Sequence, residues 1–130
     1  MMVLDASALV ELLLLSAVGH RLERRLLAEG QTLHAPHLVD VEVAHVLRRY
    51  CLKGAMSPWR GQAALEVLAE MPLTRHRHPQ FLPRIWELRN NLTAYDAAYV
   101  ALAEFLDAPL LTRDEALARS CGHSARIELV

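Results

Sequence analysis

Short apolar runs alternate with longer amphipathic segments along this whole sequence, and that alternation limits the possible folds more than any other feature. The apolar runs predict strands at residues 2–4, 32–36, 72–78, 110–112 and 126–129. Parallel strands need a crossover of about a dozen residues, usually a helix, and the intervening segments have that length. We therefore predict a three-layer α/β/α sandwich with a mostly parallel five-stranded sheet.

The helices have recognisable starts and stops. Ser7 is the expected N-cap of the first helix, and Ser57 followed by Pro58 begins another in the preferred order of cap and proline. Gly30 and Gly54 are expected just past two helix ends. The helices are predicted at residues 8–15, 19–28, 38–53, 57–71, 79–90, around 97–103 and 114–121.

Length and composition indicate one compact domain spanning residues 1–130. The chain is 53% hydrophobic and has only five glycines and six prolines, which is typical of a globular protein. Its net charge of -1 argues against strong nonspecific binding to a polyanion. Lys53 is the single lysine, so the other basic residues are arginines, which suit local contacts to phosphate but serve ordinary salt bridges equally well.

The sequence predicts a soluble, cytoplasmic protein with no membrane partner. The longest stretch without a charged residue, Gly30 to Val39, is ten residues long and too short to span a bilayer. The apolar N-terminal segment lacks a basic start and is interrupted by Asp5. Cys51 and Cys121 lie far apart without a C-x-x-C pattern, which indicates free thiols in a reducing compartment.

Acidic residues fall where strands end and helices begin. Asp5 follows the first strand, Asp114 follows the strand at 110–112, and Asp96 lies in the first turn of its helix. Glu42 lies near the start of the 38–53 helix and borders its apolar stripe. Because ligand sites in parallel sheets form at the carboxyl ends of the strands, we expect these four side chains to converge.

Each of these acids also has a simpler structural explanation. Thr93 and Asp96 match the capping box, Asp114 can be an N-cap, and Asp5 can bind turn amides. Glu42 is harder to explain in this way, because an unpaired carboxylate beside an apolar stripe is costly. None of these explanations predicts that all four acids gather at one edge of the sheet.

Gathered carboxylates repel one another, and a bound divalent cation would relieve that repulsion. An all-oxygen donor set favours a hard ion such as Mg²⁺ or Mn²⁺, which keeps several water ligands and takes others from phosphate. Such an ion can polarise a phosphodiester and stabilise the leaving oxygen. The chemistry predicted from the residues is therefore metal-assisted phosphodiester hydrolysis.

Four stretches of the chain, in order, resemble the acidic blocks of the PIN-domain family and especially its VapC-type toxins: "VLDASALVELL", "HLVDVEVAHVLRR", "LTAYDAAYVALAE" and "PLLTRD". The resemblance implies a five-stranded parallel sheet between helices and a Mg²⁺- or Mn²⁺-dependent endoribonuclease, the toxin of a toxin–antitoxin pair. It further implies a homodimer and a small antitoxin whose C-terminal segment occupies the groove. The metal-binding and catalytic residues that it implies are Asp5, Glu42, Asp96 and Asp114, with Ser7 and Thr112 as hydroxyl neighbours.

Other residues near the predicted site are less specific. Asp40 lies two positions before Glu42, but Val39, Val43 and Val46 favour Glu42 as the inward-facing acid. The arginines near the rim that could contact RNA phosphates, or pair with acids, are Arg48, Arg49, Arg89 and Arg113. The aromatic residues are assigned to packing, and the histidines, including His76 and His78, to structural or surface roles for want of a third ligand.

Two other functions remain open at this stage. One is a PIN-like binding module that has lost its catalytic activity, although the presence of all four acids argues against it. The other is an aspartate-based phosphoryl-transfer module of the receiver type. Such modules usually need a lysine at a later strand end, whereas Lys53 is predicted at the end of a helix.

Overall fold

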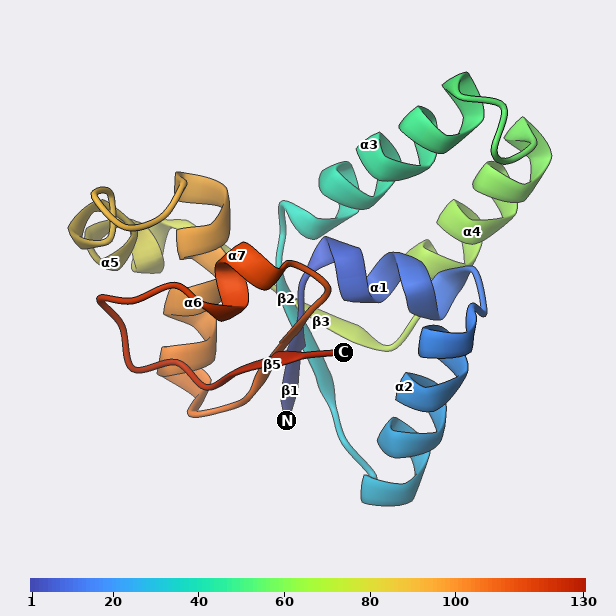
Figure 1. Ribbon diagram of the computed structural model, residues 1–130. Coiled ribbons are helices and arrows are strands. Elements are labelled where there is room, and N and C mark those ends of the chain that lie inside the picture. Colours follow the sequence, from blue (N-terminus) through green and yellow to red (C-terminus); the bar gives the residue numbers. More distant parts are fainter.

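The structure, a computed structural model, describes residues 1–130 apart from the side chain of Glu29 (Figure 1). The strands are β1 (Met2–Leu4), β2 (Leu33–Pro36), β3 (Leu73–His76), β4 (Leu110–Thr112) and β5 (Ile127–Leu129). The helices are α1 (Ala6–Leu13), α2 (Ala17–Glu29), α3 (Val39–Leu52), α4 (Pro58–Glu70), α5 (Leu82–Glu87), α6 (Ala94–Leu106) and α7 (Glu115–Ala118), with a single 3-10 turn η1 (Pro79–Phe81) before α5.

The strands form one five-stranded sheet in the order β3-β2-β1-β4-β5, and every neighbouring pair is parallel. Helices α1 to α4 lie to one side of the sheet and α5 to α7 to the other (Figure 1). Both α1 and α6 contact β1, so the central strand is covered on both faces. This confirms the predicted α/β sandwich.

The core is built around the two central strands. Val3 and Leu4 of β1 and Leu110 and Leu111 of β4 are completely buried, as expected for parallel strands covered on both faces. Helix α6 adds a continuous buried run from Ala97 to Ala103. Because several side chains in this run are small, α6 packs closely against β1 and β2.

Local sequence signals set most helix ends. The Ser57 hydroxyl accepts a hydrogen bond from the backbone N–H of Arg60, and Pro58 follows it at the start of α4. Gly30 ends α2 with φ +57°, and Gly54 follows α3 with φ +73°. Both glycines thus take the left-handed conformation expected of a helix stop, which confirms these predictions.

Three predicted helices differ clearly from the structure, and the one predicted over residues 114–121 is the short α7, which ends at Ala118. Ser7 does not cap α1: the helix begins at Ala6 because Asp5 is its N-cap. The helix predicted over residues 79–90 is wrong at both ends, because η1 comes first and α5 covers only Leu82–Glu87. The prolines at the starts of η1 and α5 break the helix there, and Asn90 with Asn91 favours the turn that follows.

The assignment of the aromatic residues to packing is only partly right. Phe81 and Tyr99 are buried, but Trp59, Trp86 and Phe105 are exposed to solvent. Helical spacing shows which residues share a face of a helix, whereas only the packing of neighbouring elements decides whether that face is covered. Among the described residues, no helix combines the length and the apolar character needed to cross a bilayer.

Candidate active site

Asp5 lies at the carboxyl end of β1 and is only 7% exposed. One of its carboxylate oxygens, Oδ1, accepts hydrogen bonds from the Ala8 backbone N–H at 2.9 Å and from the Ser7 hydroxyl at 2.6 Å. Its other oxygen, Oδ2, accepts from the Thr112 hydroxyl at 2.5 Å. Burial raises the pKa of Asp5, and these hydrogen bonds lower it again in part. The carboxylate is therefore both a helix cap and a rigidly held acid.

The hydroxyls of Ser7 and Thr112 connect the ends of the two central strands. Thr112 is fully buried, and its oxygen accepts from the Asp114 backbone N–H at 2.9 Å while its hydrogen goes to Asp5. The Ser7 oxygen accepts from the Arg113 backbone N–H at 2.8 Å. Each hydroxyl thus orients Asp5 and anchors the turn after β4, in agreement with their expected place beside the acids.

Glu42 points inward from the first turn of α3. Its Oε1 accepts a hydrogen bond from the Tyr99 hydroxyl at 2.8 Å. Burial raises the pKa of Glu42, the bond from Tyr99 lowers it in part, and the neighbouring charges of Asp5 and Asp96 raise it. Asp40 instead forms a two-pronged salt bridge with Arg75, with both closest N–O distances at 2.8 Å. The structure therefore supports Glu42 as the inward-facing acid.

The sequence interpretation missed Tyr99 as a polar contact of this site. Tyr99 lies three residues after Asp96 on α6, and residues at that spacing share one face of a helix. The ring is almost entirely buried, and burial raises the pKa of its hydroxyl, which therefore stays protonated and acts as a donor. A buried tyrosine needs a partner for its hydroxyl, so its position beside Asp96 was a usable signal.

Asp96 and Asp114 complete the group from the other side. The backbone N–H of Asp96 bonds to the Thr93 hydroxyl at 3.1 Å, so the predicted cap exists while the Asp96 carboxylate remains half-buried. Burial raises the pKa of Asp96, and the charges of Asp114 and Asp5 raise it further. Asp114 is exposed and caps α7, accepting from the Ala116 and Leu117 backbone N–H groups at 2.7 and 3.1 Å.

The structure thus places each predicted acid within electrostatic reach of at least one other, and each lies at a helix start: Asp5 at α1, Glu42 at α3, Asp96 at α6 and Asp114 at α7. The positive ends of helix dipoles compensate part of their repulsion. Within the described part of the chain, none of the four forms an ion pair with a basic side chain. No basic side chain of the described residues therefore neutralises the cluster.

The donor set fits a hard divalent cation. No three metal-binding side chains among the described residues are already gathered into a cage. Mg²⁺ does not require one, because it keeps several waters and is usually held by one or two carboxylates together with substrate phosphate. Burial and neighbouring acids raise the pKa values of the half-buried Glu42 and Asp96. The charge of a divalent cation would offset the cost of ionising these two carboxylates.

The histidines form contacts of their own, apart from the acids. His34 Nδ1 lies 3.0 Å from His76 Nε2, and the Leu38 backbone N–H donates to His78 Nε2 at 3.2 Å. Burial lowers the pKa of both His34 and His76, which favours their neutral form. These contacts agree with the structural role expected for them.

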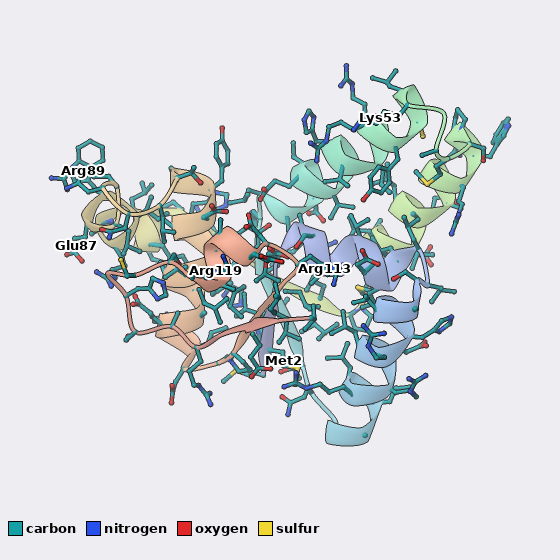
Figure 2. All side chains as sticks on the ribbon, in the orientation of Figure 1. Met2, Lys53, Glu87, Arg89, Arg113 and Arg119 are labelled. Atoms are coloured by element: carbon teal, nitrogen blue, oxygen red, sulfur yellow. The ribbon has the colours of Figure 1, made fainter. Side chains whose placement is uncertain are left out.

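Two of the four candidate arginines already have partners. Arg113 lies beside α1 near the centre of the molecule and pairs with Glu11 at 3.7 Å (Figure 2). Arg89 lies at the far tip near α5, with its guanidinium carbon 4.9 Å from the centre of the Trp86 ring (Figure 2). Arg48 and Arg49, on α3, remain as the candidates for contact with an anionic ligand.

Comparison with known proteins agrees with this arrangement. Residues 2–122, nearly the whole chain, match the model of the PIN domain. The chain belongs to the PIN-domain family. Among its relatives, Ribonuclease VapC12 of Mycobacterium tuberculosis is 44% identical over 130 residues, which cover 100% of this chain and 99% of that protein. Ribonuclease VapC1 of the same species is 43% identical over 129 residues, covering 98% of this chain and 96% of the relative.

A solved structure shares the fold of this PIN domain. The crystal structure of PAE2754 from Pyrobaculum aerophilum superposes with a TM-score of 0.73 and covers 97% of this chain and 81% of that one. At 21% sequence identity, this similarity concerns the fold alone. Membership of the PIN family excludes the receiver-type phosphoryl-transfer module. The position of Lys53 agrees with this, because it lies at the far end of α3 and not at a strand end, where such a module needs its lysine (Figure 2).

Proposed function

We propose that this PIN domain is a Mg²⁺- or Mn²⁺-dependent endoribonuclease and the toxin of a toxin–antitoxin pair. The observation that carries the proposal is the cluster of four carboxylates at four helix starts, with no basic side chain of the described residues paired to it. Relatives that match almost the full length of the chain are named VapC ribonucleases, which supports RNA as the substrate class.

In this proposal Asp5, Glu42, Asp96 and Asp114 hold the cation. When bound, the ion polarises the phosphodiester and stabilises the leaving oxygen. Asp5 is fixed by three hydrogen-bond donors, so its carboxylate does not have to reorganise. Glu42 is oriented by the hydrogen bond that its Oε1 accepts from Tyr99, which leaves Oε2 to bind the cation.

The partners follow from the same relationship. The VapC names of the relatives support a cognate small antitoxin, and we propose that its C-terminal segment occupies the active-site groove. We further propose that the protein acts as a homodimer in the cytoplasm. Expression of this chain alone is then expected to arrest growth, and co-expression of a small neighbouring gene to relieve the arrest. Growth unaffected by strong expression of folded protein would refute the toxin role.

Cleavage of RNA by the purified protein tests the catalytic part of the proposal. The wild-type protein is expected to cut RNA with Mg²⁺ or Mn²⁺ and to stop when EDTA is added. Asp96→Asn keeps the size of the side chain but removes its charge, and is expected to abolish cleavage without unfolding the protein. Asp40→Asn is the matched control, because Asp40 faces Arg75 rather than the cluster.

Equal cleavage by the Asp96→Asn protein would refute the assignment of the site. A folded wild-type protein that binds RNA but does not cut it with either metal would instead support the catalytically inactive binding module. Circular dichroism of each variant separates loss of activity from loss of folding.

A further inference from the structure

A hollow in the surface adjoins the acidic cluster. It has a volume of about 470 Å³ and lies between α3 and the first turn of α6. Glu42 belongs both to its wall and to the cluster, so the two sites are continuous. The rest of the wall combines apolar and basic side chains, contributed mainly by Val41, Val46, Tyr95, His45 and Arg49.

The apolar part of this wall is unusually open to solvent. Tyr95 is 66% exposed and Val41 is 73% exposed, although each is a large hydrophobic residue. Tyr95 directly precedes Asp96 on α6 and lines the same hollow as Glu42. An exposed aromatic ring at the edge of a pocket is the type of surface on which a nucleobase stacks.

The basic part of the wall lies on the same face of α3. Val41, His45 and Arg49 follow one another at intervals of four residues and therefore form one stripe along the helix. Among the described residues, neither His45 nor Arg49 has an ion pair or a side-chain hydrogen bond, whereas Arg75 is fully engaged with Asp40. An unpaired guanidinium beside a pocket is suited to bind a phosphate.

We propose that this hollow binds one nucleotide of a single-stranded RNA, adjacent to the phosphodiester at the carboxylates. The base stacks on the Tyr95 ring and packs against Val41 and Val46, and the phosphate of the same nucleotide binds Arg49. This assignment rests on the proposed ribonuclease function. These side chains would position the RNA strand as it enters the site of the carboxylates.

The chemistry of the pocket favours a nucleotide over a protein segment. Its volume is in the range of small-ligand pockets, about 300–1,000 Å³. A guanidinium and an aromatic ring in the same wall complement a phosphate and a base, and Glu42 links the hollow to the other acids. The alternative occupants are protein, either the proposed antitoxin segment or a second copy of this chain. In both cases Tyr95→Ala would leave RNA binding unchanged.

RNA binding by variants of Tyr95 and Arg49 tests this proposal. The probe is a fluorescein-labelled single-stranded RNA of random sequence, about 12 nucleotides long, measured by fluorescence anisotropy in EDTA so that no cleavage occurs. Tyr95→Ala is expected to raise Kd at least roughly fivefold, and Tyr95→Phe, which keeps the ring, to recover most of that loss. Trp59→Ala is the control, because Trp59 is also an exposed aromatic residue but lies on α4 and does not line the hollow.

The arginine is tested in the same assay. Arg49→Ala is expected to weaken binding to all sequences and to lower the slope of log Kd against log salt concentration by about one. Arg48→Ala is the matched control, because Arg48 is the neighbouring arginine of α3 but does not line the hollow. It is expected to change Kd by less than about twofold.

Three results would overturn the proposal. The first is a Tyr95→Ala protein that binds the RNA probe as tightly as wild type. The second is a folded wild-type protein that does not bind the probe. The third is a Tyr95→Ala protein whose molecular mass in light scattering differs from that of wild type while its RNA binding is unchanged. The last result would identify the hollow as a contact between two copies. If the wild-type protein cleaves RNA and Tyr95→Ala has no effect, only the nucleotide site fails. If binding depends on Tyr95 but no cleavage occurs, only the ribonuclease function fails.

Discussion

Replacing Thr112 with valine removes one hydroxyl that serves two acidic residues. The hydroxyl donates to Asp5 at 2.5 Å and accepts from the backbone N–H of Asp114 at 2.9 Å. Thr112 is fully buried, so water cannot easily take its place. A hydrogen bond to an ionised group contributes about 1.5–3 kcal/mol and a neutral one about 0.5–1.5 kcal/mol. We therefore expect Thr112→Val to lower the free energy of unfolding by about 2–4 kcal/mol at neutral pH.

The loss should depend on pH in a defined direction. Burial raises the pKa of Asp5 above its ordinary value of 3.8, so ionising this group costs folding stability as the pH rises through its raised folded-state pKa. The bond from Thr112 offsets part of that cost, and its removal raises the pKa further. The destabilisation is thus largest where Asp5 is ionised, and it shrinks towards the contribution of the neutral bond as the pH falls towards 3.8.

Urea unfolding of the metal-free protein in EDTA measures this effect. In thermal unfolding at neutral pH, the melting temperature of Thr112→Val should be about 10 °C below that of wild type. Thr112→Ser is the control, because it keeps the hydroxyl and loses only a methyl group. Two outcomes would contradict the reasoning: the same loss for Thr112→Val at neutral and at acid pH, or an equal loss for the serine variant at neutral pH.

Three further predictions follow. Gly19→Ala should destabilise the fold by at least ~2 kcal/mol in urea unfolding, because its Cβ would lie 2.0 Å from the Glu11 carbonyl oxygen. Gly61→Ala, whose Cβ would meet only flexible side chains at 3.4 Å or more, should be neutral or stabilising by up to ~1 kcal/mol; the same sign for both would contradict the packing argument. Tyr99→Phe should raise the pKa of Glu42 and shift the acidic limb of the pH–rate profile of RNA cleavage to higher pH, and coincident profiles would exclude a role for this bond. Mg²⁺ at roughly 100 times its Kd should stabilise the protein by about 2.7 kcal/mol in thermal unfolding, and unfolding curves that do not respond to Mg²⁺ would contradict the proposed metal site.

The sequence by itself determined the strands, most helix ends and the positions of the four acids. Ser57 and Gly30 act within one helical turn, and the bonds they govern form between neighbours in the chain. Asp5, Asp96 and Asp114 likewise lie at helix starts because local hydrogen bonds place them there. These features are predictable since the interactions that fix them span only a few residues.

Only the tertiary structure decided which distant groups meet. Thr112 reaches Asp5 because β4 lies beside β1 in the sheet, and Tyr99 reaches Glu42 because α6 packs across the central strands. The same packing leaves Tyr95 exposed, two residues before the buried run that begins at Ala97 on the same helix. The periodicity of a helix fixes which side chains share a face, but what covers that face depends on the order of the strands and on the packing of the other helices.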